Sequence, residues 1–175
     1  MMTLEETILM TQIGYENLLA KIAEKEKEYD QVRDHRQVAF ELSGDGWHDN
    51  PEFNRMQQLE ANLNHTLKTL NDRLDIMKFI DIHDGMRNVH QVEVGSIVKL
   101  CRYDLADDSS QEETWEIRGF DETNIKFKHL AYNAPLAEKI MNLHVGDVVE
   151  EINIGSRHFD IEVVALFKNR ENAGI

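Results

Sequence analysis

The first half of the chain carries apolar residues at spacings of three and four. One run, over residues 15–43, contains no glycine or proline, and a second run covers residues 52–84. Such a period places one apolar face along a helix. Two such faces joined by a short turn predict an antiparallel coiled coil, with each helix of about 30 residues being about 45 Å long. The apolar positions are Tyr15, Leu18, Leu19, Ile22, Tyr29, Val32 and Ala39, then Phe53, Met56, Leu59, Leu63, Leu67, Leu70, Leu74 and Met77.

The pattern changes beyond Gly85, which breaks the second helix and opens a hinge over residues 85–90. Short segments with alternating polar and apolar residues then predict strands. A polar stretch, residues 107–113, predicts a hairpin loop, and residues 135–143 predict a short helix that begins with proline. We therefore expect an α+β protein: a coiled coil over residues 1–84 and a compact domain of antiparallel sheet with a short helix over residues 91–175. The predicted strands are 92–100, 114–118, 124–128, 147–154 and 158–166.

Composition indicates which partners and which cell compartment suit the protein. The net charge of −14 argues against broad contact with nucleic acid and favours a basic partner surface. A single cysteine, Cys101, excludes an internal disulfide and favours the reducing cytoplasm. No apolar run approaches the roughly 20 residues of a membrane span. The first ten residues carry acids where a secretory signal carries lysine or arginine, so we expect neither membrane insertion nor export.

The turn between the helices, residues 44–53, reads GDGWHDNPEF. Gly44 suits the left-handed end of a helix, Asn50 is a good N-cap, and Pro51 fits a first helical turn. These three roles explain the glycine, the asparagine and the proline. They leave Asp45, Trp47, His48 and Asp49 without an explanation.

Each of these side chains has a structural and a functional interpretation. Asp45 and Asp49 suit turns and caps, and their carboxylates are also ligands for magnesium. His48 is either a solvated turn residue or a general base near neutral pH. Trp47 at a loop tip predicts a partner contact, because a tip offers little core to join.

The turn also carries a family motif. Gly44-Asp45 and the run from Asp49 to Phe53 line up with G-D-x-x-E-N-A-E-Y, the tip pattern of the Gre family of bacterial transcript-cleavage factors, GreA and GreB. The likeness covers nearly the whole chain. In the second half it rests on residues 94–98, 115–119 and 145–149, and on 133–137 in place of the family's S-P-L-G/A. The chain thus resembles factors that have an acidic coiled-coil tip and an FKBP-like C-terminal domain.

This resemblance implies a transcription elongation factor that binds RNA polymerase and inserts its tip into the secondary channel. There it would stimulate the polymerase's own cleavage of backtracked RNA, acting on the nascent RNA 3′ end indirectly and without sequence-specific DNA binding. Asp45 and Asp49 would be the catalytic carboxylates, holding a magnesium ion shared with the polymerase, so the factor would own no active site. The implied tip contacts are Trp47, His48, Asn50 and Glu52, and the implied docking residues are Asn133, Pro135 and Leu136.

The tip departs from the family pattern at the pair that matters most. Three residues separate Asp45 from Asp49, where the family has two between its acids, and the family's glutamate is an aspartate here. A regulator that occupies the same channel but inhibits or modulates the polymerase is therefore a second interpretation. A prolyl isomerase or chaperone-like binding module is a third, since FKBP-like folds can isomerise prolyl bonds.

Overall fold

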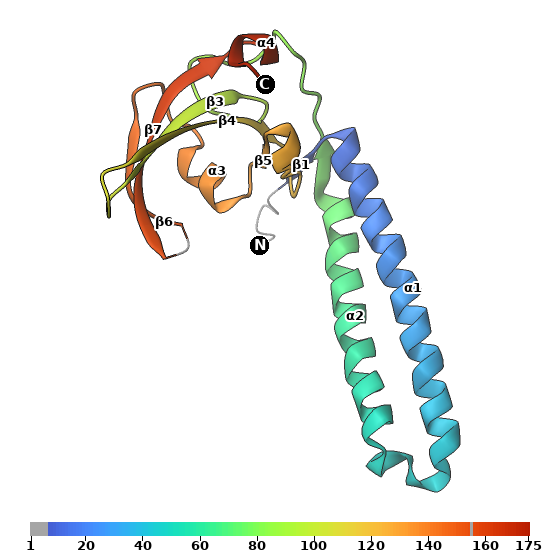
Figure 1. The fold of residues 1–175 in the computed structure, drawn as a ribbon. Helices are drawn as coiled ribbons and strands as arrows, with labels where there is room; N and C mark the ends of the chain where they lie inside the picture. Colours follow the sequence, from blue (N-terminus) through green and yellow to red (C-terminus); the bar gives the residue numbers. More distant parts are fainter. Residues whose placement is uncertain (1–6, 155) are drawn as a thin grey trace, which may run out of the picture. The chain divides into compact units, whose positions relative to one another are not determined.

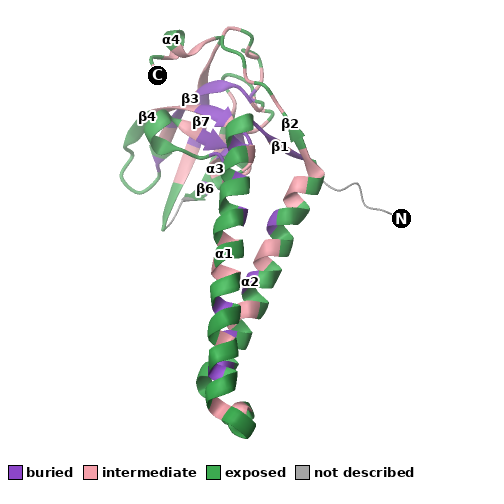
Figure 2. Cartoon of the chain, turned by 90° about the vertical axis from the view of Figure 1, so that its right-hand side faces the viewer, coloured by how far each residue is buried: buried purple, intermediate pink, exposed green. Residues whose placement is uncertain are grey.

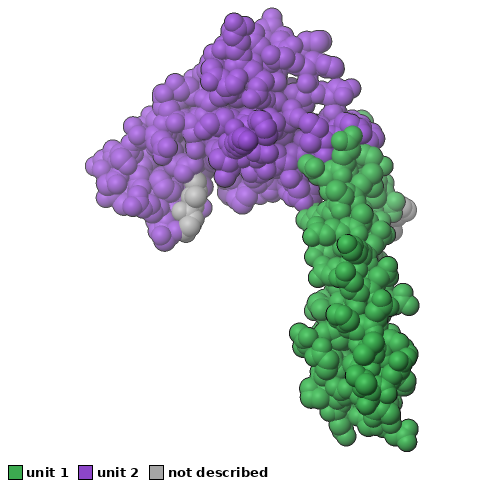
Figure 3. Space-filling model, turned by 45° about the vertical axis from the view of Figure 1, so that its right-hand side comes forward, with its two compact units in different colours: residues 1–8, 15–78 green, residues 9–14, 79–175 purple. Residues whose placement is uncertain are grey.

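A computed structural model describes residues 7–154 and 156–175. The chain divides into two compact units, which Figure 3 shows in different colours. Unit 1 is built on residues 15–78, and unit 2 combines residues 9–14 with residues 79–175. The N-terminal acidic residues up to Glu6, on which the expectation of no export signal rests, lie outside the described residues.

Unit 1 is a helical hairpin, as the apolar period predicts (Figure 1). Helix α1 (Gln12–Ser43) and helix α2 (Pro51–Ile76) are joined by a 3-10 helix, η1 (Gly44–Asp49). At 1.5 Å per residue, α1 is about 48 Å long and α2 about 39 Å. Buried positions recur along both helices with exposed residues between them (Figure 2). They include Leu18, Ile22, Val32, Ala39, Phe53, Met56, Leu63 and Leu70.

The apolar seam is interrupted by a charged pair that joins the two helices. Arg36 of α1 stands where a strict heptad would place an apolar residue, and its Nε lies 2.7 Å from Oε2 of Glu60 in α2. Glu60 Oε1 also accepts a 3.5 Å hydrogen bond from the Tyr29 hydroxyl. The interruption therefore specifies how the helices align, because only one register brings these groups together.

The second helix is shorter than its apolar pattern predicts. It ends at Ile76 instead of Asp84, and the chain continues as strand β2 (Met77–Phe79), which pairs with β1 (Ile8–Met10). The backbone N–H of Ile80 then donates to the Met10 carbonyl at 2.9 Å. Pairing with a distant strand overrides the local helical period here, and residues 76–82 are rich in the β-branched and aromatic types that strands favour.

Unit 2 contains a five-stranded sheet in the order β5-β4-β3-β7-β6. The predicted α+β class is confirmed, although the sheet is mixed: β5 runs parallel to β4, and the other neighbours are antiparallel. The chain leaves β4 and turns back before β5, so the edge strand runs the same way as β4. The elements are β3 (Ile97–Asp104), β4 (Ser110–Arg118), β5 (His129–Ala131), α3 (Pro135–Ile140), β6 (Val148–Ile154), β7 (Arg157–Phe167) and α4 (Arg170–Ala173).

The strand predicted at residues 124–128 is wrong. Residues Ile125–Phe127 form a 3-10 turn, η2, and the strand begins only at His129. The reason is a local closure: Asn124 and His129 exchange two backbone hydrogen bonds, of 3.0 and 2.9 Å, which folds the intervening residues into a loop. Similarly, the strand predicted from residue 92 begins at Ile97, because Gly95 adopts a positive φ of 96° in a turn.

The core of unit 2 lies among the sheet strands and α3. Its fully buried members are aliphatic and come from the inward positions of the alternating strands, as period two requires. They include Val98, Leu100, Ile117, Ile161 and Val163 from the sheet, with Ala137 and Ile140 from α3. No helix in the described residues is long and apolar enough to cross a membrane.

A buried carboxylate organises one side of the sheet. Glu116 of β4 is 1% exposed and accepts hydrogen bonds from Arg118 at 2.8 Å, from Arg87 at 3.4 Å and from Arg170. Burial raises the pKa of Glu116, but these guanidiniums outweigh it and hold the pKa below its ordinary value. The cluster therefore joins the segment that follows β2 and the C-terminal helix α4 to the central sheet.

Candidate functional site at the hairpin tip

The turn GDGWHDNPEF forms as its local chemistry predicts. Gly44 has a φ of 51°, in the left-handed region that ends a helix at little cost for glycine. Asn50 is the N-cap of α2 and Pro51 occupies its first turn. Between them, residues 44–49 form the 3-10 helix η1, which positions all the candidate functional side chains of the tip.

Asn50 ties the two helices together. Its side-chain oxygen accepts from the backbone N–H groups of Glu52 and Phe53 at 2.9 and 3.3 Å. Its side-chain nitrogen donates to the Ala39 carbonyl at 3.2 Å and to the Ser43 hydroxyl. One amide thus caps α2 and satisfies a carbonyl in the last turns of α1. Asn50, an expected tip contact, therefore has a structural role. The sequence predicted its N-cap but not its link to α1.

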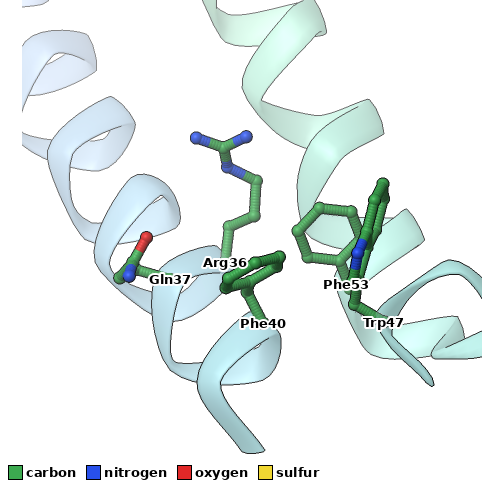
Figure 4. Close-up of a pocket in the computed structure, with 5 residues that line it drawn as sticks. All are labelled: Arg36, Gln37, Phe40, Trp47 and Phe53. Carbon is green, nitrogen blue, oxygen red and sulfur yellow. The ribbon is translucent and has the colours of Figure 1, made fainter. Parts of the chain in front are cut away.

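The tip has a small aromatic core, contrary to the expectation for Trp47. Trp47 is half-buried, and its ring centroid lies 5.9 Å from that of Phe40 and 5.1 Å from that of Phe53. Phe40 and Phe53 are 6.0 Å apart. With Arg36 and Gln37 these rings line a hollow of about 220 Å³. Figure 4 shows the five side chains. Phe40 lies outside the apolar positions predicted for the first helix, so the apolar period did not indicate it.

Both aspartates of the turn are exposed. Asp45 and Asp49 stand in η1, and within the described part of the chain neither carboxylate has a hydrogen-bond or ion-pair partner. Their oxygens are therefore available to an external ligand. Asn50 provides the N-cap of α2. Capping of that helix therefore does not account for Asp45 and Asp49.

Glu52 and His48 are engaged locally. Arg55 donates two hydrogen bonds of 3.0 Å to the Glu52 carboxylate, and these lower the pKa of Glu52. The His48 ring lies against Trp47, with centroids 3.4 Å apart, while its carbonyl accepts from the Asn54 side chain at 3.3 Å. Glu52 is thus paired within α2, and the exposed His48 ring lies against the indole at an interplanar angle of 34°.

The predicted docking residues in unit 2 have unequal exposure. The Asn133 side chain exchanges two 2.9 Å hydrogen bonds with Asp121, one through the Asp121 backbone N–H and one through its carboxylate. Leu136 packs against the core and Pro135, in the first turn of α3, is exposed. Of the three, Pro135 is the one that presents most of its surface.

The exposed metal donors at the tip include the carboxylate oxygens of Asp45 and Asp49. Carboxylate oxygens suit magnesium, which keeps several waters and needs only one or two protein carboxylates. Across residues 7–154 and 156–175, no group of three or more histidine, cysteine, aspartate or glutamate side chains is arranged to hold a metal.

Part of unit 2 matches a known protein family. Residues 87–166 match the family model described as "Transcription elongation factor, GreA/GreB, C-term". This segment belongs to the GreA/GreB C-terminal family. The match covers most of unit 2, and the tip described above precedes it in the chain.

One relative is similar over nearly the whole chain, the hairpin included. A GreA transcription elongation factor from Nautilia profundicola is 28% identical over 162 residues, which are 89% of this chain and 92% of the relative. A GreA of Maricaulis maris is 28% identical over 102 residues, 58% of this chain and 61% of that protein. The solved GreA factor homolog 1 (Gfh1) of Thermus thermophilus is 18% identical, with a TM-score of 0.42, covering 93% of this chain and 99% of that one.

Proposed function

We propose that this Gre-family protein binds RNA polymerase, inserts its hairpin tip into the secondary channel and stimulates the enzyme's own cleavage of backtracked RNA. The observation that carries this proposal is the exposure of Asp45 and Asp49 on a turn that Asn50 and three aromatic rings hold in place. Relatives along nearly the whole chain are named transcription elongation factor GreA, which supports the choice of partner.

Some tip residues hold the turn in place, and others present ligands. Asn50 and the rings of Phe40, Trp47 and Phe53 hold the turn, so its carboxylates are positioned before the partner is met. Asp45 and Asp49 present hard oxygen ligands. A magnesium ion bound between them and the polymerase would supply the activation of water for phosphodiester hydrolysis. The protein lends ligands to another enzyme's site and carries no active site of its own.

A second function follows from the spacing of the aspartates. With three residues between Asp45 and Asp49, and a shorter side chain at the second position, the tip differs from the pattern of cleavage factors. The same hairpin would then occupy the secondary channel and inhibit or modulate the polymerase. The two functions share the partner and the tip, and they differ in whether the carboxylates complete a metal site.

The experiment is a cleavage assay on a stalled, backtracked elongation complex with end-labelled RNA. The protein is titrated in while polymerase binding is measured in parallel. Stimulated shortening of the RNA supports the cleavage function. Binding without stimulation at any magnesium concentration favours the inhibitor, and the absence of binding contradicts both.

A further inference from the structure

The loop that replaces the predicted strand at residues 124–128 exposes two large apolar side chains. Ile125 is 71% exposed and Phe127 is 52% exposed. Exposed lysines, Lys126 and Lys128, alternate with them along the chain. Each lysine ammonium lies over an aromatic ring, Lys126 at 5.8 Å from the Phe127 centroid and Lys128 at 5.7 Å from that of Trp115. Apolar and cationic groups therefore share one short surface loop.

The loop is held in place from several sides. Besides the closure between Asn124 and His129, the Lys128 carbonyl accepts a 2.8 Å hydrogen bond from the backbone N–H of Glu116. The Phe127 carbonyl accepts from Arg170 at 3.4 Å. Because Arg170 and Glu116 belong to the buried ion cluster, the loop is anchored to the sheet. A partner would pay little ordering entropy to bind a surface that is already shaped.

The charge of the loop opposes that of the whole protein. The chain has a net charge of −14, yet residues 124–128 contain two lysines and no acid. Glu116, whose backbone N–H bonds to the loop, has a buried carboxylate that is paired with three arginines. An acidic partner surface would therefore be attracted to this loop and repelled by much of the rest of the molecule.

The chemistry favours a protein partner over a nucleic acid. Base stacking needs a free ring face, and a lysine ammonium lies over one face of Phe127 and one face of Trp115. The more exposed of the two apolar groups, Ile125, is aliphatic and offers no stacking platform. An aliphatic group and a ring flanked by cations instead suit an apolar patch that is bordered by carboxylates.

We propose that the loop Ile125–Lys128 is a docking surface for an apolar patch bordered by acidic side chains on RNA polymerase. This inference rests on the proposed function and names a surface of unit 2 that the motif residues Asn133, Pro135 and Leu136 do not include. The apolar pair provides the contact area, and the lysines provide attraction at a distance.

The test compares two double variants of the full chain for binding to core polymerase. Ile125→Ser with Phe127→Ser removes the apolar pair and should weaken binding about tenfold or more, mainly through faster dissociation. Lys126→Gln with Lys128→Asn removes the charges, and asparagine tolerates the positive φ of 58° at position 128. This variant should associate more slowly and show a weaker dependence on salt. Val145→Ser with Val148→Ser is the control, since these valines are also exposed, at 51% and 50%.

The outcomes separate this inference from the proposed function. If the natural protein binds polymerase and all three variants bind equally well, the loop is not a docking surface, while the proposed function stands. If the natural protein fails to bind polymerase, the proposed function fails first. Saturating concentrations of the loop variants should restore full cleavage, because the tip is intact. Binding of a single-stranded RNA oligonucleotide that the lysine variant abolishes would overturn the protein-docking assignment.

Discussion

The side-chain nitrogen of Asn50, at the start of α2, lies 3.2 Å from the carbonyl oxygen of Ala39 in α1. This bond crosses the tip and runs beside the capping bonds that the same amide accepts from Glu52 and Phe53. Because one side chain serves both helices, the turn that carries the aspartates depends on an asparagine at this position. Aspartate cannot perform both functions, because its carboxylate has no hydrogen to donate.

Asn50→Ala should lower the free energy of unfolding of the hairpin by about 1–2 kcal/mol, through loss of the cap and of the link to α1. Asn50→Asp should lose less, because aspartate still caps α2 but cannot donate to Ala39. Chemical denaturation followed by helical circular dichroism measures both. Asn64→Ala, on the exposed surface of α2, is the matched control. Equal stability of all three variants would show that the bond to Ala39 contributes nothing.

The ion pair between Arg36 and Glu60 should contribute modestly to stability. Both side chains are partly exposed, at 34% and 17%, so Arg36→Ala should cost about 0.5–1 kcal/mol. Replacing both residues by leucine should recover that loss or exceed it, because the apolar seam becomes continuous. Thermal unfolding of the single and double variants measures this. A double variant less stable than Arg36→Ala would contradict the assignment of these positions to the seam.

The buried Glu116 predicts a specific response to acid. Its pKa is lowered in the folded protein, so the stabilisation from its charge is complete above the ordinary pKa and is lost as the pH falls through the lowered value. Glu116→Gln should lose about 3–5 kcal/mol at pH 7, because three arginines lose their partner. Its stability should then fall less steeply than the natural protein's below about pH 4.5. Urea unfolding from pH 7 to pH 3 measures the slopes, with the exposed Glu138→Gln as control. Equal slopes in all three proteins would contradict the account.

Trp47 should report on the aromatic core of the tip. In a Trp115→Phe background its fluorescence should be blue-shifted relative to free tryptophan, since the indole is packed between Phe40 and Phe53. Trp47→Ala should destabilise the hairpin by about 2 kcal/mol, less than the roughly 3–5 kcal/mol of a fully buried ring. Trp47→Phe should retain most of that stability. Emission like that of a fully solvated indole would contradict the packing.

The local chemistry of the sequence predicted what depends on neighbours along the chain. The apolar period of α1, the left-handed Gly44, the Asn50 cap and the short helix at Pro135 all follow from residues within one or two turns. What failed depends on distant pairing. Helix α2 stops at Ile76 because β1 pairs with the next segment, and residues 124–128 form a loop because Asn124 closes on His129.

The same division applies to the candidate site. The motif identified Asp45 and Asp49, whose exposure the structure shows. The expectation that Trp47 lacks a core to join was wrong, because its ring packs against Phe40. Phe40 precedes Trp47 by seven residues and is not one of the apolar positions predicted for the first helix. The link from Asn50 to Ala39 spans the turn, and no spacing rule along one helix predicts it.

The most direct test of the account is cleavage of backtracked RNA by polymerase with Asp45→Asn and Asp49→Asn, over a range of magnesium concentrations. Asparagine keeps the turn but removes a charged ligand. We predict that stimulation falls about a hundredfold or more in each variant, that polymerase binding is unchanged, and that added magnesium partly restores the rate. Stimulation by both variants equal to that of the natural protein, at every magnesium concentration, would contradict the claim that these carboxylates complete the metal site.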